Sequence, residues 1–159
     1  MSVDKVFSST YNRTMKIKQT RNTLSDTYLD AVRIRQIVFV KGQSVPLSLE
    51  IDENEAYCLH FVLYDDKDQA AATCRILPNK EHSEVILQRM AVLPAYQKQN
   101  LGRFLLEDVI QFCQKQGFKR MILHAQLTAK GFYDKLGFTY FGKEFEEAGI
   151  MHISMEKIL

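Results

Sequence analysis

The sequence has few cysteines, no long apolar run and little net charge. Its three cysteines, Cys58, Cys74 and Cys113, lie in apolar stretches without the paired spacing of metal or redox motifs, which predicts buried free thiols. The longest apolar runs, near residues 37–40 and 61–64, are far too short to cross a bilayer, and the first residues lack the apolar core of a signal peptide. We therefore expect a cytoplasmic protein with no membrane partner and no metal.

A formal net charge of +2 is too small to argue for nucleic-acid binding, because such proteins carry a strong basic excess on one face. Lys16, Lys18, Arg33 and Arg35 could join into a patch. Aromatic residues are not interleaved with them, as single-strand binding requires. We expect no nucleic-acid partner.

The remaining composition is that of an ordinary globular protein, with 46% apolar and 25% charged residues. Its length matches one domain, so a single domain over residues 1–159 is expected. The apolar periodicity predicts an α/β (α+β) fold with the order β-α-β-β-β-α-β-α-β-β.

Strands are expected at residues 15–19, 56–64, 69–77, 84–92, 121–125, 138–141 and 152–155. A first helix is expected to run from a capping box at Thr23 and Asp26 to about Phe39. The second has apolar residues at helical spacing from Leu101 and is closed by Gly117; the third covers residues 128–136.

A polar loop at residues 93–100 joins an expected strand directly to an expected helix. The first N–H groups of a helix have no partner within it and carry partial positive charge, so a phosphate can bind there. Asn100 and Gly102 tolerate unusual backbone conformations, and Lys98 and Arg103 add positive charge. Taken alone, the same letters are also typical of an ordinary strand-to-helix connection.

Residues 97–102 resemble the signature of the GNAT superfamily of N-acetyltransferases, which is Arg or Gln, any two residues, Gly, any residue, then Gly or Ala. Asn100 stands where Gly is usual. Residues 90–94 resemble the family's fourth strand, whose backbone binds the pantetheine arm of coenzyme A. Residues 126–138 resemble its second motif, with Gln126 in place of Asn, then Ala129, Tyr133 and a closing Leu-Gly-Phe.

The resemblance covers about residues 15–155 and is narrower to an ElaA-like and YjcF-like subgroup. That likeness rests on residues 35–40, Gln43, residues 45–46, Asp52, His60, residues 149–152 and Met155, with Gly42 where Glu is common. It implies a GNAT acyl-CoA N-acyltransferase fold, with a mixed central sheet of six to seven strands flanked by helices. The implied cofactor-binding residues are Met90, Ala91, Val92, Gln97, Lys98, Gln99, Asn100, Leu101, Gly102, Arg103, Gln126 and Tyr133.

The implied chemistry is transfer of an acetyl group from acetyl-CoA to a primary amine of a small molecule or protein, by direct attack in a ternary complex. The resemblance implies that Tyr133 is the general acid; the alternative is a core aromatic residue whose hydroxyl meets a backbone carbonyl. His124 is the candidate base, because its pKa range suits neutral catalysis. A chain of waters could also carry the proton.

The acceptor region is expected to include Glu50, Asp52, His60 and His152. The acidic residues Glu50, Asp52 and Glu53 could attract a cationic amine, although a solvated loop also explains them. The acceptor itself stays open, since its pocket is built by variable loops, and a homodimer is possible. A non-catalytic acyl-CoA-binding regulatory module is the alternative function.

Overall fold

The computed structural model describes residues 5–8 and 14–159. Its strands are β1 Lys5–Ser8, β2 Thr14–Thr20, β3 Leu59–Tyr64, β4 Ala70–Pro78, β5 Glu84–Val92, β6 Arg120–Gln126, β7 Thr139–Glu147 and β8 Ile150–Ile158. Its α-helices are α1 Asp26–Arg35, α2 Leu47–Glu50, α3 Leu101–Lys115 and α4 Lys130–Lys135. Single 3₁₀ turns occur at Glu55–Tyr57, Pro94–Tyr96 and Leu127–Ala129.

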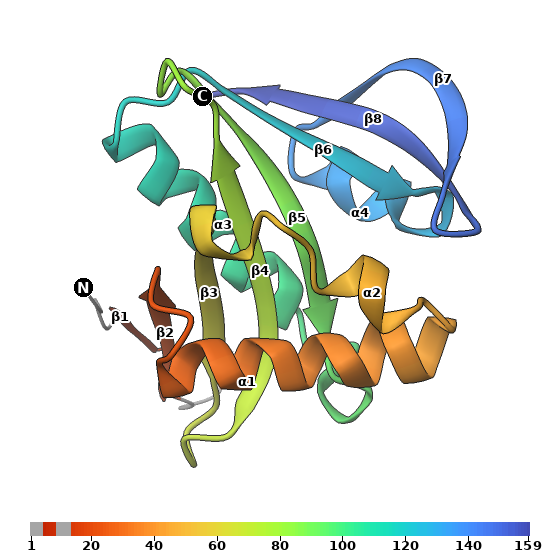
Figure 1. The fold of residues 1–159 in the computed structure, drawn as a ribbon. Coiled ribbons are helices and arrows are strands. Elements are labelled where there is room, and N and C mark those ends of the chain that lie inside the picture. The colour runs from red at the N-terminus through yellow and green to blue at the C-terminus, as the bar shows by residue number, and fades with distance from the viewer. Residues whose placement is uncertain (1–4, 9–13) are drawn as a thin grey trace.

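The eight strands form one sheet in the order β1-β2-β3-β4-β5-β6-β8-β7 (Figure 1). Neighbouring strands are antiparallel, except that β5 and β6 are parallel and are joined through α3. The predicted mixed sheet is confirmed. It has one more strand than expected, because Lys5–Ser8 pairs with β2 ahead of the first predicted strand.

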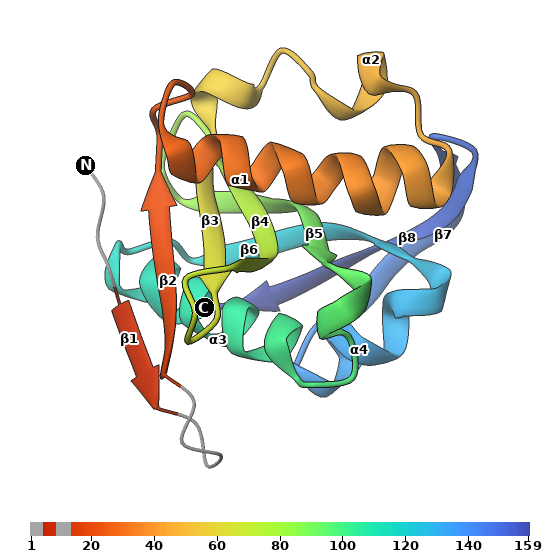
Figure 2. The ribbon, with the colours of Figure 1, turned by 90° about the horizontal axis from the view of Figure 1, so that it is seen from below.

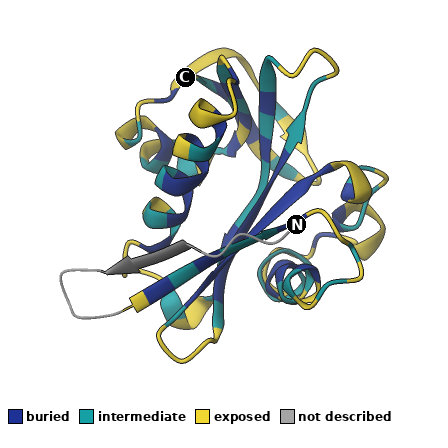
Figure 3. Cartoon of the chain, turned by 90° about the vertical axis from the view of Figure 1, so that its left-hand side faces the viewer, coloured by how far each residue is buried: buried dark blue, intermediate teal, exposed yellow. Residues whose placement is uncertain are grey.

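Helices cover both faces of the sheet (Figure 2). On one face α1 packs on β3 and β4, where Ala31 and Ile34 contact Val62 and Tyr64. On the other face α3 contributes buried residues such as Leu105 and Val109 to the larger core. Buried residues therefore follow the sheet between two helical layers (Figure 3). The three cysteines are all buried and free, as predicted.

The first helix differs from expectation at both ends. Its N-cap is Ser25, whose Oγ accepts the Tyr28 N–H at 3.2 Å, so the expected capping box at Thr23 is wrong. After Arg35 the chain continues as a π-helix, Gln36–Lys41. A π-helix adds a residue to each turn and is frequent at functional sites. The predicted continuous helix to Phe39 is therefore an α-helix followed by a π-helix.

A β-bulge in β5 determines where the sheet opens. Thr73 pairs with Ala91 but Arg75 pairs with Gln88, so two residues of β5 lie opposite one of β4. Arg89, inside this bulge, has a φ of 59°. Bulges bend the strand that carries them. Among the described residues, the β5–β6 ladder ends at the pair Leu87 and Leu123, just before the bulge. Beyond this pair the two strands diverge toward their carboxyl ends (Figure 1).

Candidate active site

The diverging ends of β5 and β6 open into a cavity of about 1010 Å³. Its walls come from both strands, the start of α3, α4 and the β7–β8 hairpin. Most of the residues predicted for the cofactor line it, together with Tyr133, His124, Glu50, Asp52 and His152. Of the expected cofactor residues, only Gln99 is not part of the lining; of the expected acceptor residues, only His60 is not.

The loop between β5 and α3 has the backbone that an anion site needs. Asn100 is the N-cap of α3 with φ 60° and ψ 20°, and its side chain makes no capping hydrogen bond. Lys98 also has a positive φ, of 63°. Tyr96 donates a hydrogen bond to Asp65 at 2.7 Å, which fastens the loop to the β3–β4 turn. The Asn at this position is therefore explained by its tolerance of the left-handed conformation.

The two cations of this loop are placed differently. Lys98 lines the cavity at its exposed rim. Arg103 also lines it, but its Nε donates to Glu107 at 2.8 Å one turn along α3. Part of the charge of Arg103 is thus already compensated within the helix.

Tyr133 lies in α4, lines the cavity and is 8% exposed. Its ring is packed edge-on against Phe132 and Phe138, with centroids 5.0 and 5.8 Å away. Burial raises the pKa of Tyr133 well above the ordinary tyrosine value, so its hydroxyl keeps its proton at neutral pH. The phenol can donate a hydrogen bond to a group in the cavity.

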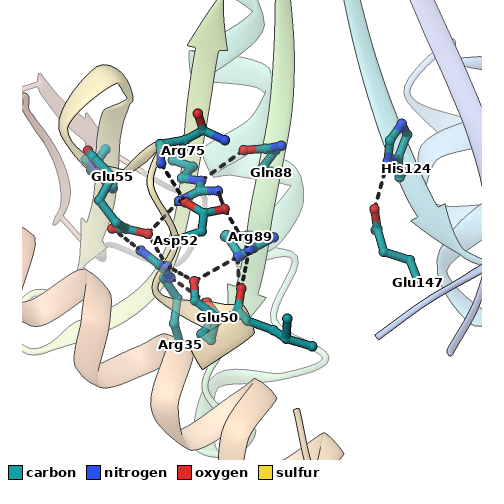
Figure 4. Close-up of polar contacts among 12 residues, drawn as sticks. Arg35, Glu50, Asp52, Glu55, Arg75, Gln88, Arg89, His124 and Glu147 are labelled. Atoms are coloured by element: carbon teal, nitrogen blue, oxygen red, sulfur yellow. Dashed lines mark hydrogen bonds and ion pairs between the residues drawn. The ribbon is translucent and has the colours of Figure 1, made fainter. Parts of the chain in front are cut away.

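His124 stands on β6, on the opposite wall from the acidic residues of the α2 region (Figure 4). Its Nδ1 is 3.2 Å from Glu147 Oε1, and its ring meets Phe145 edge-on at 5.1 Å. His152 lies on β8, the strand between β6 and β7, with its Nε2 3.7 Å from Glu147 Oε2. Glu147 and Phe145 were absent from the predicted site, because only the pairing of β7 with β8 brings them there.

Gln126 ends β6 and faces Gln43, which follows the π-helix. The two amides exchange a pair of hydrogen bonds, with N–O distances of 2.9 and 3.2 Å. Both residues line the cavity. This amide pair joins the α1–α2 connection to the far wall, a contact that the sequence gives no means of predicting.

Glu50 and Asp52 belong to a buried ionic network (Figure 4). Arg35 donates to both Glu50 and Glu55 at 2.6 Å, and Arg75 donates to Glu55 at 2.5 Å and to Asp52 at 2.7 Å. Arg89 completes the network with Glu50 at 3.2 Å and Asp52 at 3.3 Å. Three arginines thus balance three carboxylates, and the network holds the segment after α2 against β4 and β5.

Ionisation in this network follows from burial and pairing. Burial alone would raise the pKa of Glu55, but hydrogen bonds from Arg35 and Tyr28 and the charge of Arg75 bring it below its ordinary value. Burial is likewise outweighed at Asp52, where Arg75 holds the pKa below its ordinary value. Burial and the hydrogen bond to Glu55 raise the pKa of Tyr28 to about 12.

His60 is 1% exposed behind this network. Its Nε2 donates to the Glu55 carbonyl at 2.9 Å and its ring meets Tyr28 edge-on at 4.9 Å. Burial lowers the pKa of His60, so the neutral imidazole is favoured. The structure therefore places His60 in the core beside Glu55 and not among the residues that line the cavity.

The basic residues near the N-terminus contact acidic or aromatic side chains. Lys16 pairs with Asp68 at 3.2 Å, and Lys18 lies over the Tyr64 ring. Arg33 lies 3.8 Å from Asp30, while Arg35 is buried in the ionic network. Within residues 5–8 and 14–159, no helix is long and apolar enough to cross a membrane, and no group of His, Cys, Asp or Glu could hold a metal ion.

Comparison with known proteins identifies the family. Residues 35–159 match the family described as "Acetyltransferase (GNAT) domain". The chain is 35% identical over 130 residues to "Uncharacterized N-acetyltransferase YjcF" of Bacillus subtilis, a match covering 80% of this chain and 90% of that protein. It resembles the crystal structure of Escherichia coli ElaA with a TM-score of 0.79 and 26% identity, over 90% of this chain and 99% of that one.

A more distant likeness, which concerns the fold alone, is to an aminoglycoside 6′-N-acetyltransferase crystallised with coenzyme A. The TM-score is 0.64 at 13% identity, covering 88% of this chain and 96% of that one. The chain belongs to the GNAT family of acetyltransferases. It is an N-acetyltransferase that takes its acetyl group from acetyl-CoA.

Proposed function

We propose that the acetyl group is transferred inside the cavity between β5 and β6, with Tyr133 as general acid and His124 as general base. The observation that carries this proposal is the shape of one cavity. The N-terminus of α3 lies along it, the free ends of β5 and β6 form its sides, and Tyr133 and His124 line it.

Each part of acetyl-CoA is assigned to a different wall of the cavity. The pyrophosphate is proposed to bind the loop from Gln97 to Arg103, where Lys98 and Asn100 have positive φ. The pantetheine arm is proposed to lie along Met90, Ala91 and Val92, past the point where the β5–β6 ladder ends. Gln126, now paired with Gln43, is proposed to orient the arm from the opposite wall.

For acetyl transfer, the acceptor amine must be neutral, and the departing thiolate needs a hydrogen-bond or proton donor. An alkyl ammonium has a pKa of about 10.4, so a base must remove a proton, whereas a thiol pKa of about 8.5 makes the thiolate a tolerable leaving group. Since burial raises the pKa of Tyr133, its contribution is a hydrogen bond to the sulfur more than a complete proton transfer. Burial also raises the pKa of Cys58 to about 11 and of Cys113 to about 12, which supports direct attack over a cysteine intermediate.

The expected acceptor residues differ in how well their positions support a role in binding the amine. His152 and Asp52 line the cavity, and 26% of the Asp52 side chain is exposed. Glu50 lines it too, but its side chain is 3% exposed and is enclosed by Arg35 and Arg89. His60 receives no support, because it lies outside the lining.

Turnover with a panel of amines tests the proposal. Purified protein is mixed with acetyl-CoA and a polyamine, an amino sugar, a simple alkylamine or a peptide N-terminus, and release of the coenzyme A thiol is followed. We expect release with at least one amine, reduced in Tyr133→Phe and His124→Asn. Tight binding of acetyl-CoA without release for any amine would favour the regulatory acyl-CoA-binding module.

We also propose that residues 1–159 act as one domain in the cytoplasm, without nucleic acid, with a homodimer as the alternative to a monomer. The three free, buried cysteines support a reducing compartment. The contacts of Lys16 with Asp68, Lys18 with Tyr64 and Arg33 with Asp30 compensate part of the positive charge, which supports the absence of a nucleic-acid surface. Light scattering of the purified protein decides between monomer and dimer.

A further inference from the structure

The tip of the β7–β8 hairpin forms part of the cavity wall. Glu147, Ala148 and Ile150 line the cavity there, and Glu147 pairs with Ile150 across a two-residue turn. Both turn residues have positive φ, 52° at Ala148 and 77° at Gly149, as the tight type I′ hairpin turn requires. Such φ values are uncommon for alanine. The turn fixes the position from which Glu147 projects.

Glu147 holds its carboxylate between two imidazoles. One oxygen is 3.2 Å from His124 Nδ1, and the other is 3.7 Å from His152 Nε2. Phe145 packs on both rings, edge-on to His124 at 5.1 Å and stacked with His152 at 5.9 Å. The rings come from β6 and β8 and the carboxylate and phenyl group from β7, so three strands determine the arrangement.

The hydrogen bonds determine which nitrogen of each imidazole carries a proton. A carboxylate only accepts, so the contact with Glu147 places a proton on His124 Nδ1 and leaves Nε2 with its lone pair. His152 Nδ1 is 2.7 Å from the Ile150 carbonyl, which also only accepts, so that nitrogen carries the proton of His152.

We infer that Glu147 is the positioning residue of the base: it fixes the His124 tautomer and stabilises the imidazolium formed during turnover. The inference rests on His124 being the base of the proposed function. The His152 ring flanks the carboxylate from the other side, with its Nε2 3.7 Å from the second oxygen.

The proton balance is complete without another reactant. His124 Nε2 takes one proton from the acceptor ammonium, which becomes a neutral amine. The amine nitrogen bonds to the thioester carbon and the C–S bond breaks. The nitrogen's second proton goes to the departing thiolate, and His124 returns its proton to water. The sum is ammonium plus acetyl-CoA giving amide, coenzyme A thiol and one proton.

Three variants test Glu147. Glu147→Ala removes both the charge and the hydrogen-bond acceptor, whereas Glu147→Gln removes the charge but keeps an acceptor oxygen. Glu146→Ala is the matched control, because it deletes the same charge at the adjacent, exposed position of β7, where the side chain turns to the other face. The substrate is the amine turned over fastest in the panel, paired with its β-fluorinated analogue of lower amine pKa.

We expect Glu147→Ala to lower kcat about 10-fold, Glu147→Gln to lose less, and Glu146→Ala to match the wild type. The fluorinated amine has a lower pKa and loses its proton more easily. Glu147→Ala should therefore lower kcat less for this amine than for the parent amine. Nitrogen-15 NMR of the histidine side chains provides a readout independent of turnover: His124 should carry its proton on Nδ1 in the wild type and in Glu147→Gln, and shift toward Nε2 in Glu147→Ala.

The failures can be told apart. If the wild type releases thiol but Glu147→Ala and Glu146→Ala behave alike in turnover and tautomer, Glu147 has no positioning role and the proposed function stands. If Glu147→Ala lowers kcat equally for both amines, the loss does not lie in removal of the amine proton and the inference is wrong. If no amine is acetylated by the wild type, the proposed function fails and this inference fails with it.

Discussion

Replacing Glu55 with glutamine should be among the most damaging single-atom changes in this protein. The carboxylate accepts four hydrogen bonds: from Tyr28 at 2.7 Å, from Arg35 at 2.6 and 3.0 Å, and from Arg75 at 2.5 Å. An amide keeps one acceptor oxygen and turns the other into a donor that faces other donors. Two bonds are lost, and the network of three arginines and three carboxylates gains an uncompensated positive charge.

The size of the effect follows from burial. Breaking a buried ion pair by changing one partner costs about 3–5 kcal/mol, out of a total stability of about 5–15 kcal/mol for a domain. For a chain of this length that loss lowers Tm by about 6–20 °C. Asp52→Asn should cause a smaller loss of stability. The Asp52 side chain is 26% exposed, so water can replace part of the lost hydrogen bonding. We expect about 1 kcal/mol for that variant.

The measurement is urea unfolding followed by circular dichroism at neutral and acidic pH. Because the folded-state pKa of Glu55 lies below its unfolded value, its contribution is complete above the unfolded pKa and is lost as the pH falls through the folded pKa. The difference in the free energy of unfolding between the wild type and Glu55→Gln should therefore become smaller as the pH is lowered. A Glu55→Gln protein within about 0.5 kcal/mol of the wild type at neutral pH would refute this account of the network.

Three further predictions concern the site. Tyr133→Phe should lower kcat about 10–100-fold with little change in acetyl-CoA affinity, as expected from one lost hydrogen bond to a charged group; unchanged turnover would remove Tyr133 from the mechanism. Asn100→Gly should preserve or tighten acetyl-CoA binding in calorimetry, because glycine adopts the φ of 60° freely; a large loss would show that the amide itself binds. The three cysteines should react slowly with a chromogenic disulfide in native protein and rapidly in urea, since burial raises their pKa values; fast native reaction would contradict their burial.

Local patterns predicted the elements that depend on local sequence. The strand Glu84–Val92 and the start of the helix at Leu101 were predicted to the residue, because clear turn signals and apolar periodicity mark them. The last two strands are longer than predicted, since β7 is largely exposed and lacks the alternation that identifies a strand. The strand Lys5–Ser8 was missed altogether.

The site was predictable only where a motif spans consecutive residues. The loop before α3 and Tyr133 in α4 belong to such motifs, and both line the cavity. The acidic residues near Glu50 were interpreted as a possible amine-binding cluster because their arginine partners, such as Arg75 and Arg89, lie on other strands. The pairing of His124 with Glu147 likewise depends on the order of β6, β8 and β7 in the sheet.

The early end of the β5–β6 ladder bears on how such a protein can diversify. Among residues 5–8 and 14–159, four residue pairs, from Glu84 with Arg120 to Leu87 with Leu123, join the two halves of the sheet directly. The strands before α3 carry the wall proposed for the pantetheine arm and the arginines Arg75 and Arg89 of the ionic network, while the strands after it carry His124, His152 and Glu147. If the proposed assignments hold, mutations in the β7–β8 hairpin would alter the choice of acceptor and leave the proposed nucleotide-binding half unchanged.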